Sequence, residues 1–353
     1  VKTSLDRPGF VRVRAVLVDG KGQVYRKKYT GDTTTPEGKR AQNEFERRDR
    51  RIFFDGGAGV QIDKLVSYPE PKDFDAFWAK QADRLKLVPI KADRIELPCS
   101  NPKARLYAVQ IACAGLRPVT GYLTIPVAAS ATNRMPIQAC YRGASMAEME
   151  APKGGPHDRI RMEINVNGYD LGRGEAYIKD FFTSISKPGY GYGMDPESNA
   201  SRETSYWKDV ALRAIRYLQW ITTLPEWDGV HVKVCGGSMG GFQAIQAAAH
   251  EARVTEADIS IPWLCDLRAI RAGRLGGWRP APAAGLDYYD TVCASTRVLC
   301  PVEITAGLGD YVCPPSGVTA LYHALPGRVR LHFLQNRTHP YTAPEYDTYT
   351  MEK

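Results

Sequence analysis

The sequence predicts an α/β protein in which a mostly parallel β-sheet is covered by helices on both faces, with a small β module before it. Three observations predict this fold class. Strand-like and helix-like segments alternate through most of the chain, an order typical of parallel sheets. The first 66 residues instead alternate between apolar and polar with period two. A serine among glycines stands where one strand-like run gives way to a helical one.

The N-terminal module is expected over residues 1–66. Apolar and polar residues alternate in 10–18 and again in 24–29, and "DGKG" separates the two runs. Runs of this kind around a short glycine-containing turn are typical of a β-hairpin. A second turn is expected in "DGGAGV", at 55–60. We therefore expect a β-sandwich-like module here.

The larger domain is expected over residues 67–353. "SYPEPKD" carries two prolines, as linkers do, and apolar residues recur at helical spacing in "FDAFWAKQADRLKL" behind it. Residues 206–224 place their apolar side chains on one stripe, the pattern of a helix packed on a sheet. The segments after it alternate as strand "VHVKVC", helix "FQAIQAAAHEA", strands "TEADISIP" and "RVLCPVEITAGLGD", helix "SGVTALYHAL" and strand "RVRLHFLQ".

Composition and charge exclude several classes of protein. The net charge is +8, and the first 52 residues hold 14 Lys or Arg against 7 Asp or Glu, so the rest of the chain is nearly neutral. The basic stretch "RRDRR" at 47–51 fits a solvated loop better than contact with an acidic polymer. No nucleic-acid-binding motif accompanies it, and we expect no nucleic acid partner. No apolar run approaches the roughly 20 residues that cross a bilayer.

Neither a metal nor a cofactor is indicated by the sequence. The eight cysteines have no CxxC spacing and imply no disulfide framework, and the six histidines show no HExxH or similar ligand spacing. We therefore expect no metal site. The chain opens on Val1 rather than Met, from which we expect a processed start.

A candidate nucleophile lies in "VKVCGGSMGG", at 232–241. Gly236, Ser238 and Gly240 form a G-x-S-x-G motif between a strand and a helix. A tight turn at this place strains the serine backbone and lifts its Oγ clear of the sheet, and a Cβ at either glycine would collide with strand or helix. The alternative is a plain glycine-rich turn or a phosphate-binding loop, but the order G-x-G-x-x-G is absent.

A serine nucleophile needs a base and an acid that orients the base. In hydrolases with such a turn the chain order is serine, acid, histidine, with the last two on loops after later strands. Asp310 and His339 follow the strand-like runs "PVEITAGLG" and "RVRLHFLQ", so we expect them to be the acid and the base. Asp266 and Asp287 are weaker candidates for the acid that also fit helix caps, whereas the three histidines in helical or strand patterns are expected to be structural: His250, His323 and His332.

The oxyanion of a tetrahedral intermediate needs backbone donors. One is expected at the amide of Met239, directly after the candidate nucleophile, and another in the loop after an early strand. "MPIQACYRGAS" ends such a strand at Tyr141, which we expect to supply the second amide. The alternative role of Tyr141 is that of a core aromatic residue.

Several segments resemble the acetyl xylan esterase and cephalosporin C deacetylase family of carbohydrate esterases (family 7). They are "PEWDGVHVKVCGGSMGGFQAIQAAA", "IPWLCD", "GLGDYVCPPSGVTALYHAL" and the helical "DFDAFWAKQADRL" ahead of the first strands. The resemblance implies an α/β-hydrolase fold without a cofactor. It also implies that Ser238 is the nucleophile, Asp310 the acid and His339 the base, with the amides of Tyr141 and Met239 as the oxyanion hole.

The same resemblance implies a serine esterase that removes acetyl groups from acetylated xylan or xylo-oligosaccharides through an acyl-enzyme intermediate. Together with the N-terminal module it favours a secreted or periplasmic protein, and assembly into homo-oligomers is left open. The sequence departs from the family at Met239, where Gln is common, and at Pro340, where Glu usually follows the base. The alternatives are a peptidase of the prolyl oligopeptidase kind and an inactive, carbohydrate-binding homologue.

Overall fold

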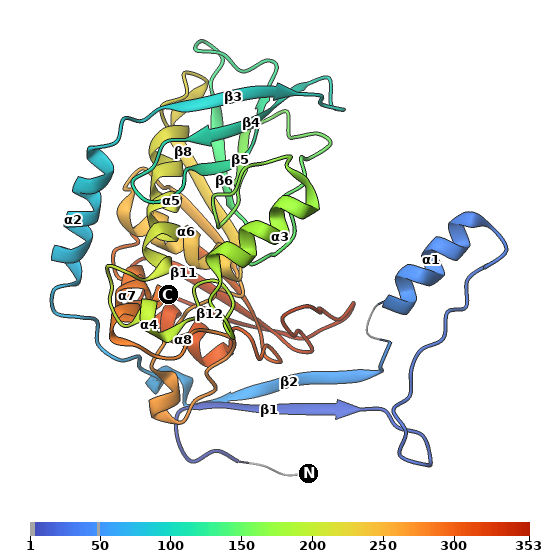
Figure 1. Cartoon of the computed structure of the whole chain (residues 1–353). Coiled ribbons are helices and arrows are strands. Elements are labelled where there is room, and N and C mark those ends of the chain that lie inside the picture. The colour runs from blue at the N-terminus through green and yellow to red at the C-terminus, as the bar shows by residue number, and fades with distance from the viewer. Residues whose placement is uncertain (1–3, 48–49) are drawn as a thin grey trace.

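The computed structural model describes residues 4–47 and 50–353, and its largest feature is a ten-stranded β-sheet (Figure 1). The strand order is β12-β11-β10-β9-β8-β6-β7-β5-β4-β3. The strands are β3 (Ala92–Leu97), β4 (Ala104–Ile111), β5 (Val119–Pro126), β6 (Met135–Tyr141), β7 (Ile160–Ile164), β8 (Trp227–Gly237), β9 (Glu256–Ser260), β10 (Val302–Gly307), β11 (Val329–Leu334) and β12 (Thr348–Glu352).

The six central strands of this sheet, β7, β6, β8, β9, β10 and β11, run parallel. β5, β4 and β3 form an antiparallel meander on one side, and β12 closes the other edge antiparallel to β11. The mostly parallel sheet predicted from the sequence is therefore confirmed. Because the parallel strands point the same way, their carboxyl ends meet at one edge, and the loops that carry the candidate site residues start there.

A layer of helices packs on one face of the sheet. α6 lies against β6, β8 and β9 and contacts α5 and α7, while α8 contacts β10 and β11. The apolar stripe predicted for residues 206–224 is buried in α5, whose first turn is capped by the Ser205 side chain accepting from Trp207 N. The helices of the large domain are α2 (Phe74–Lys86), α3 (Gly174–Ile185), α4 (Pro196–Asn199), α5 (Tyr206–Ile221), α6 (Met239–His250), α7 (Thr291–Ser295) and α8 (Pro315–Ala324), with short 3-10 helices η2 (Ala269–Ala272) and η3 (Ala284–Tyr289).

The opposite face of the sheet is polar from β8 to β12. Successive strand residues point to opposite faces, so Val232 and Val234 are buried toward α6 while Lys233 and Cys235 of the same strand are half-buried. Ion pairs between neighbouring strands lie on this polar face, such as Lys233 with Glu256 at 2.8 Å. Charged pairs need no apolar cover, so this part of the face reaches solvent.

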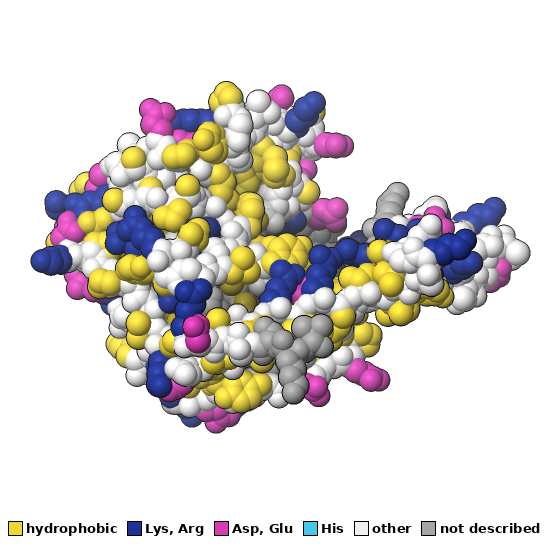
Figure 2. Space-filling view, turned by 90° about the horizontal axis from the view of Figure 1, so that it is seen from below, with side chains coloured by type: hydrophobic (Ala, Val, Ile, Leu, Met, Phe, Trp, Pro, Cys, Tyr) yellow, Lys and Arg dark blue, Asp and Glu magenta, His cyan; other side chains and the backbone are white. Residues whose placement is uncertain are grey.

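The N-terminal region is a two-stranded antiparallel ribbon that projects from the large domain (Figure 1). It consists of β1 (Gly9–Val16) and β2 (Phe53–Val60), with α1 (Pro36–Arg47) beyond its far end, and η1 (Ile62–Lys64) follows it. Hydrophobic and basic side chains share the surface of this arm (Figure 2).

The β-sandwich expected over residues 1–66 is wrong, because the part of this range that the structure describes holds one sheet and not two facing ones. The expected turn does form, with Asp19 N donating to Gln23 O at 2.9 Å. The predicted hairpin is limited to its tip, where Val18 bridges Val24 and Tyr25 N donates to Leu17 O at 2.9 Å, because β1 before it pairs with residues 53–60. The ribbon packs instead on the large domain, where the rings of Phe10 and Phe333 lie 5.5 Å apart. The boundary between residues 66 and 67 stays a prediction.

Two further expectations from the sequence concern the basic stretch and membrane-spanning helices. The basic stretch at 47–51 includes residues 48 and 49, which lie outside the described residues. Across 4–47 and 50–353, none of the helices is both long enough and apolar enough to cross a membrane.

Candidate active site

Ser238 occupies a strained turn between β8 and α6. Its backbone angles are φ 54° and ψ −120°, a region that residues with a side chain rarely adopt and that must be imposed by the surroundings. Ser238 N donates to Ser260 O at 2.9 Å, and Ser238 O accepts from Trp263 N at 3.0 Å. These bonds to the next strand and to the loop behind it hold the turn, and the side chain is half-buried at the carboxyl edge of the sheet.

The two glycines of the motif are required by close backbone contacts. A Cβ on Gly236 would lie 2.4 Å from Gly240 C, and a Cβ on Gly240 would lie 2.0 Å from Tyr141 O. Both distances are far below van der Waals contact with backbone atoms that have no room to move. The strand–turn–helix with glycines on both sides of the serine is therefore present as the sequence predicts.

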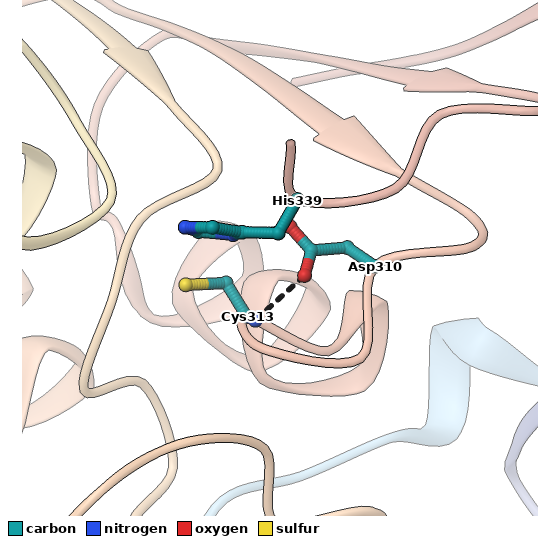
Figure 3. Close-up of side chains that lie close together, drawn as sticks. All are labelled: Asp310, Cys313 and His339. Atoms are coloured by element: carbon teal, nitrogen blue, oxygen red, sulfur yellow. Dashed lines mark hydrogen bonds and ion pairs between the residues drawn. The ribbon is translucent and has the colours of Figure 1, made fainter. Parts of the chain in front are cut away.

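Asp310 and His339 meet on the loops that follow β10 and β11. Asp310 Oδ2 lies 3.0 Å from His339 Nδ1, and Asp310 Oδ1 accepts from the amides of Val312 and Cys313, each at 2.8 Å. The carboxylate is 1% exposed, whereas the imidazole is 22% exposed. With Nδ1 on the carboxylate, the other ring nitrogen, Nε2, lies on the side of the ring away from Asp310 (Figure 3).

Cys313 lies close to both the candidate nucleophile and the candidate base, and sequence reasoning did not assign it a place in the site. Its Sγ is 4.0 Å from Ser238 Oγ. Its Sγ, one oxygen of Asp310 and one ring nitrogen of His339 all lie within 4.8 Å of one another. Burial, and then the nearby Asp310 charge, raise the pKa of the Cys313 thiol well above its usual value. Cys313 is therefore a neutral thiol at the centre of the group.

The same three side chains are of the types that bind Zn²⁺. Both oxygens of Asp310 already accept hydrogen bonds within the protein, and Cys313 is in its protonated form. Metal binding would have to break the hydrogen bonds of Asp310 and deprotonate the Cys313 thiol. The arrangement therefore fits proton transfer through His339 better than metal ligation.

The backbone of Tyr141 lies beside Gly240, the residue that follows Met239 in α6. Tyr141 is the last residue of β6, and its carbonyl touches the first turn of α6 at Gly240. The loop after Tyr141 is tied to the same helix by Gln243 Nε2, which donates to Arg142 O at 2.9 Å. The Tyr141 ring is buried and its hydroxyl donates to Ala214 O at 3.1 Å, so the side chain is part of the core and only the backbone faces the turn.

The weaker candidates make other contacts. Asp266 is buried in an ion pair with Arg274, and Asp287 pairs with Arg268, so neither is the partner of His339. Three histidines contact groups outside the site: His250 the Trp78 ring, His323 the carbonyl of Ile62, and His332 the Glu303 carboxylate.

The N-terminal ribbon supports the loops that carry the acid and the base. Gly309 packs so closely on the ribbon that a Cβ there would lie 2.1 Å from Asp55 O. Asp55 N donates to Asn336 Oδ1 at 3.1 Å, three residues before His339. The Asp55 carboxylate accepts from Arg12 Nε at 2.7 Å, and the Arg12 guanidinium lies 5.1 Å from the Tyr311 ring centroid. No motif in the sequence points to these contacts.

Two exposed aromatic rings lie at the rim of the site. Trp278 is 45% exposed and Tyr311 is 46% exposed. Trp278 N donates to Val312 O at 3.0 Å, which holds this residue against the Asp310 loop. By contrast, Trp207 in α5 is fully buried.

Comparison with known proteins places this geometry in a family. The acetyl xylan esterase (AXE1) family matches residues 61–276 and 283–351. The chain belongs to the acetyl xylan esterase family. Among characterised relatives, acetyl esterase Axe7A of Xylanibacter ruminicola is 29% identical over 290 residues, which are 76% of this chain and 65% of that protein. The chain thus spans about two thirds of the length of this relative.

Solved structures of the family share the fold. Acetyl xylan esterase from Paenibacillus sp. R4 superposes with a TM-score of 0.66 at 23% identity, over 80% of this chain and 94% of that one. Acetyl xylan esterase 1 from Thermoanaerobacterium sp. JW/SL YS485 gives a TM-score of 0.66 at 18% identity with the same coverage. The large domain of this acetyl xylan esterase family member therefore has the α/β-hydrolase fold.

Proposed function

We propose that the protein is a serine ester hydrolase that removes acetyl groups from acetylated carbohydrates. The observation that carries the proposal is the Asp310–His339 hydrogen bond beside a serine on a strained, glycine-flanked turn. Family membership supports the ester chemistry, and the names of its relatives, an acetyl esterase and acetyl xylan esterases, support the acetyl group.

In the proposed first step, His339 Nε2 takes the proton of Ser238 Oγ as the oxygen attacks the acetyl carbonyl. Asp310 holds Nδ1 protonated, so Nε2 is the basic nitrogen and the imidazolium that forms is stabilised. His339 then gives the proton to the sugar oxygen as it leaves, and an acetyl-enzyme remains on Ser238. Water, deprotonated by His339, attacks the ester and releases acetate.

The thiol of Cys313 lies near the path of this proton. Its Sγ sits 4.0 Å from Ser238 Oγ and within 4.8 Å of one ring nitrogen of His339, and the proposed step requires Ser238 Oγ and His339 Nε2 to come within hydrogen-bond distance when substrate binds. Catalytic hydrogen bonds are often long in the free enzyme and tighten when substrate binds. The negative oxygen of the intermediate is proposed to bind the Met239 and Tyr141 amides.

Acetylated xylan or xylo-oligosaccharides are the proposed substrates. Trp278 and Tyr311 are the side chains proposed to contact the sugar, because exposed aromatic faces bind the apolar faces of pyranose rings and both lie on or against the Asp310 loop. A secreted or periplasmic location and assembly into homo-oligomers stay predictions.

The test compares the parent protein with Ser238→Ala on acetylated xylo-oligosaccharides and on an activated aryl acetate. Acetate release from the oligosaccharide that falls at least about 1,000-fold in Ser238→Ala supports the whole proposal. Ser184→Ala, an exposed position on α3, is the matched control and should keep full activity. If only the aryl acetate is cleaved, the serine mechanism stands and the carbohydrate substrate falls. Cleavage of aminoacyl amides instead would favour the peptidase alternative. The absence of turnover on every substrate would favour the inactive homologue.

A further inference from the structure

Two cysteines face each other on the strands that lead into the proposed site. Cys140 on β6 and Cys235 on β8 are paired in register, and their sulfur atoms lie 2.9 Å apart. Cys140 directly precedes Tyr141, and Cys235 directly precedes Gly236 of the turn. Paired strands are separated by about 4.8 Å, within the Cα separations that a disulfide bridges. Closing the remaining gap to a bond of about 2.05 Å requires a small rotation of the side chains.

The surroundings of this pair favour a thiolate on one sulfur. Arg161 Nε donates to Cys140 Sγ at 3.4 Å from the neighbouring strand β7. The hydrogen bond from the Cys235 thiol, followed by the one from Arg161, lowers the pKa of Cys140 to about 7, and the same pairing raises the pKa of Cys235. Two carboxylates near the pair act in the opposite direction. Glu163 raises the pKa of Cys140 but binds Arg161 at 3.4 Å, and Asp258, opposite Cys235 on β9, raises the pKa of Cys235 but binds Lys233 at 3.4 Å.

The pair also differs in acidity from most of the other cysteines. Cys235 is half-buried on the polar face of the sheet, away from α6, and Cys140 is 7% exposed. Four others are buried thiols whose pKa is raised by burial: Cys265, Cys293, Cys300 and Cys313. The pKa of the half-buried Cys113 is also raised by burial, to about 11. A small oxidant therefore finds one reactive sulfur here with a second thiol already in contact.

We propose that Cys140 and Cys235 form a reversible dithiol–disulfide site that responds to peroxides. The Cys140 thiolate attacks one oxygen of hydrogen peroxide, the O–O bond breaks, and water leaves after the departing hydroxide takes a proton. Cys140 is then a sulfenic acid. The Cys235 sulfur attacks Cys140 Sγ, the S–O bond breaks, and a second water leaves with the thiol proton. Two thiols and one peroxide thus yield one disulfide and two waters, and an external dithiol reverses the change.

The test uses the full chain, fully reduced and then treated with a small excess of hydrogen peroxide. Remaining thiols are alkylated and the digest is analysed by mass spectrometry. We expect a peptide pair linked through Cys140 and Cys235, two hydrogens lighter than the reduced pair, which dithiothreitol separates again. The rate of linkage should rise about tenfold from pH 5 to pH 6 and level off above pH 7, as the thiolate fraction of Cys140 does.

Variants make the assignment of the two sulfurs testable. Cys235→Ser should leave a sulfenic acid on Cys140 that a cyclic 1,3-dione traps, whereas Cys113→Ser, the matched control, should form the link at the parent rate. The proposal would be overturned if other cysteines were oxidised while Cys140 and Cys235 stayed reduced and were therefore recovered in alkylated form. It would also be overturned if Cys140 of the parent protein became a sulfinic acid without any link to Cys235. This outcome can be observed in the parent protein, so it does not depend on whether a variant folds.

Discussion

Asp310 Oδ2 lies 3.0 Å from His339 Nδ1, while the other oxygen of the same carboxylate is held by the amides of Val312 and Cys313. The carboxylate cannot rotate away from the imidazole without giving up two backbone hydrogen bonds. Because Asp310 is 1% exposed, replacing these two bonds with bonds to water would cost free energy. Asp310 therefore sets both the orientation of the imidazole and which of its nitrogens carries the proton.

Asp310→Asn should lower kcat by about 1,000- to 10,000-fold with little change in KM. The amide NH₂ would face Nδ1 and favour the tautomer with the proton on Nε2, which cannot accept from Ser238. Steady-state hydrolysis of an aryl acetate measures this. Asp258→Asn, at an exposed position on the polar face of the sheet, is the control. Near-parental kcat in Asp310→Asn would remove Asp310 from the proposed mechanism.

Cys313→Ala should retain activity within about tenfold of the parent protein, in contrast to Ser238→Ala. Cys313 Sγ is close to Ser238 Oγ, but burial and Asp310 raise its pKa, and a protonated thiol is a poor nucleophile. The measurement is kcat for an aryl acetate, with mass spectrometry of the trapped acetyl-enzyme. An acetyl group found on Cys313, or a loss in Cys313→Ala as large as that in Ser238→Ala, would make the thiol the nucleophile.

The parts of the fold that could be predicted from the sequence are those encoded locally. The apolar stripe of α5 and the strand–glycine–serine–glycine–helix order around Ser238 each lie within one short window, and both are present in the structure. Asp310 and His339 could be placed because parallel strands bring their following loops to one edge. For these two residues, the order of the motifs along the chain was sufficient to predict that their loops meet.

The parts that could not be predicted depend on partners far apart in the sequence. Period-two alternation shows which side of a strand is buried, but not which strand it pairs with, so β1 was given a neighbour in 24–29 instead of 53–60. The contact of Asp55 with Gly309 likewise joins segments with no shared motif. Cys313 was overlooked because a buried cysteine has no sequence signal of its own.

Gly240→Ala should lower the free energy of unfolding by about 3 kcal/mol and abolish activity. Its Cβ would lie 2.0 Å from Tyr141 O, so β6 and α6 would have to separate where the proposed oxyanion amides meet. Urea unfolding and aryl acetate hydrolysis measure the two effects. Gly20→Ala, which has no atom within 4 Å of its Cβ, should change neither. Parental stability in Gly240→Ala would show that the contact relaxes freely.

Asp55→Ala should lower the free energy of unfolding by about 1–3 kcal/mol, because it removes a buried carboxylate that accepts two charge-assisted hydrogen bonds from Arg12. It should also reduce kcat several-fold, since the ribbon supports Gly309 and Asn336 on the two loops of the site. Urea unfolding and aryl acetate kinetics on Asp55→Ala are compared with Asp63→Ala, at an exposed position of η1. Equal behaviour of the two variants would contradict a supporting role for the ribbon.

His250 should make the protein less stable at acidic pH. Its ring packs 4.3 Å from Trp78, and its Nε2 is buried without a hydrogen-bond partner among the described residues. Burial, and then the Arg297 charge, lower its pKa to about 4. The unfolded state, with a pKa near 6.5, then binds more protons than the folded state between these values. Stability is therefore complete above about pH 6.5 and falls as the pH drops toward 4, by up to about 3 kcal/mol.

His250→Phe keeps an aromatic ring against Trp78 but cannot be protonated, so it should remove this part of the acid sensitivity. Urea unfolding at intervals from pH 7 to pH 4 measures the slope for the parent and the variant. His157→Phe, at an exposed position, is the matched control and should keep the parental slope. If His250→Phe and the parent lose stability in parallel over this range, other groups carry the acid sensitivity and the burial of a neutral His250 does not.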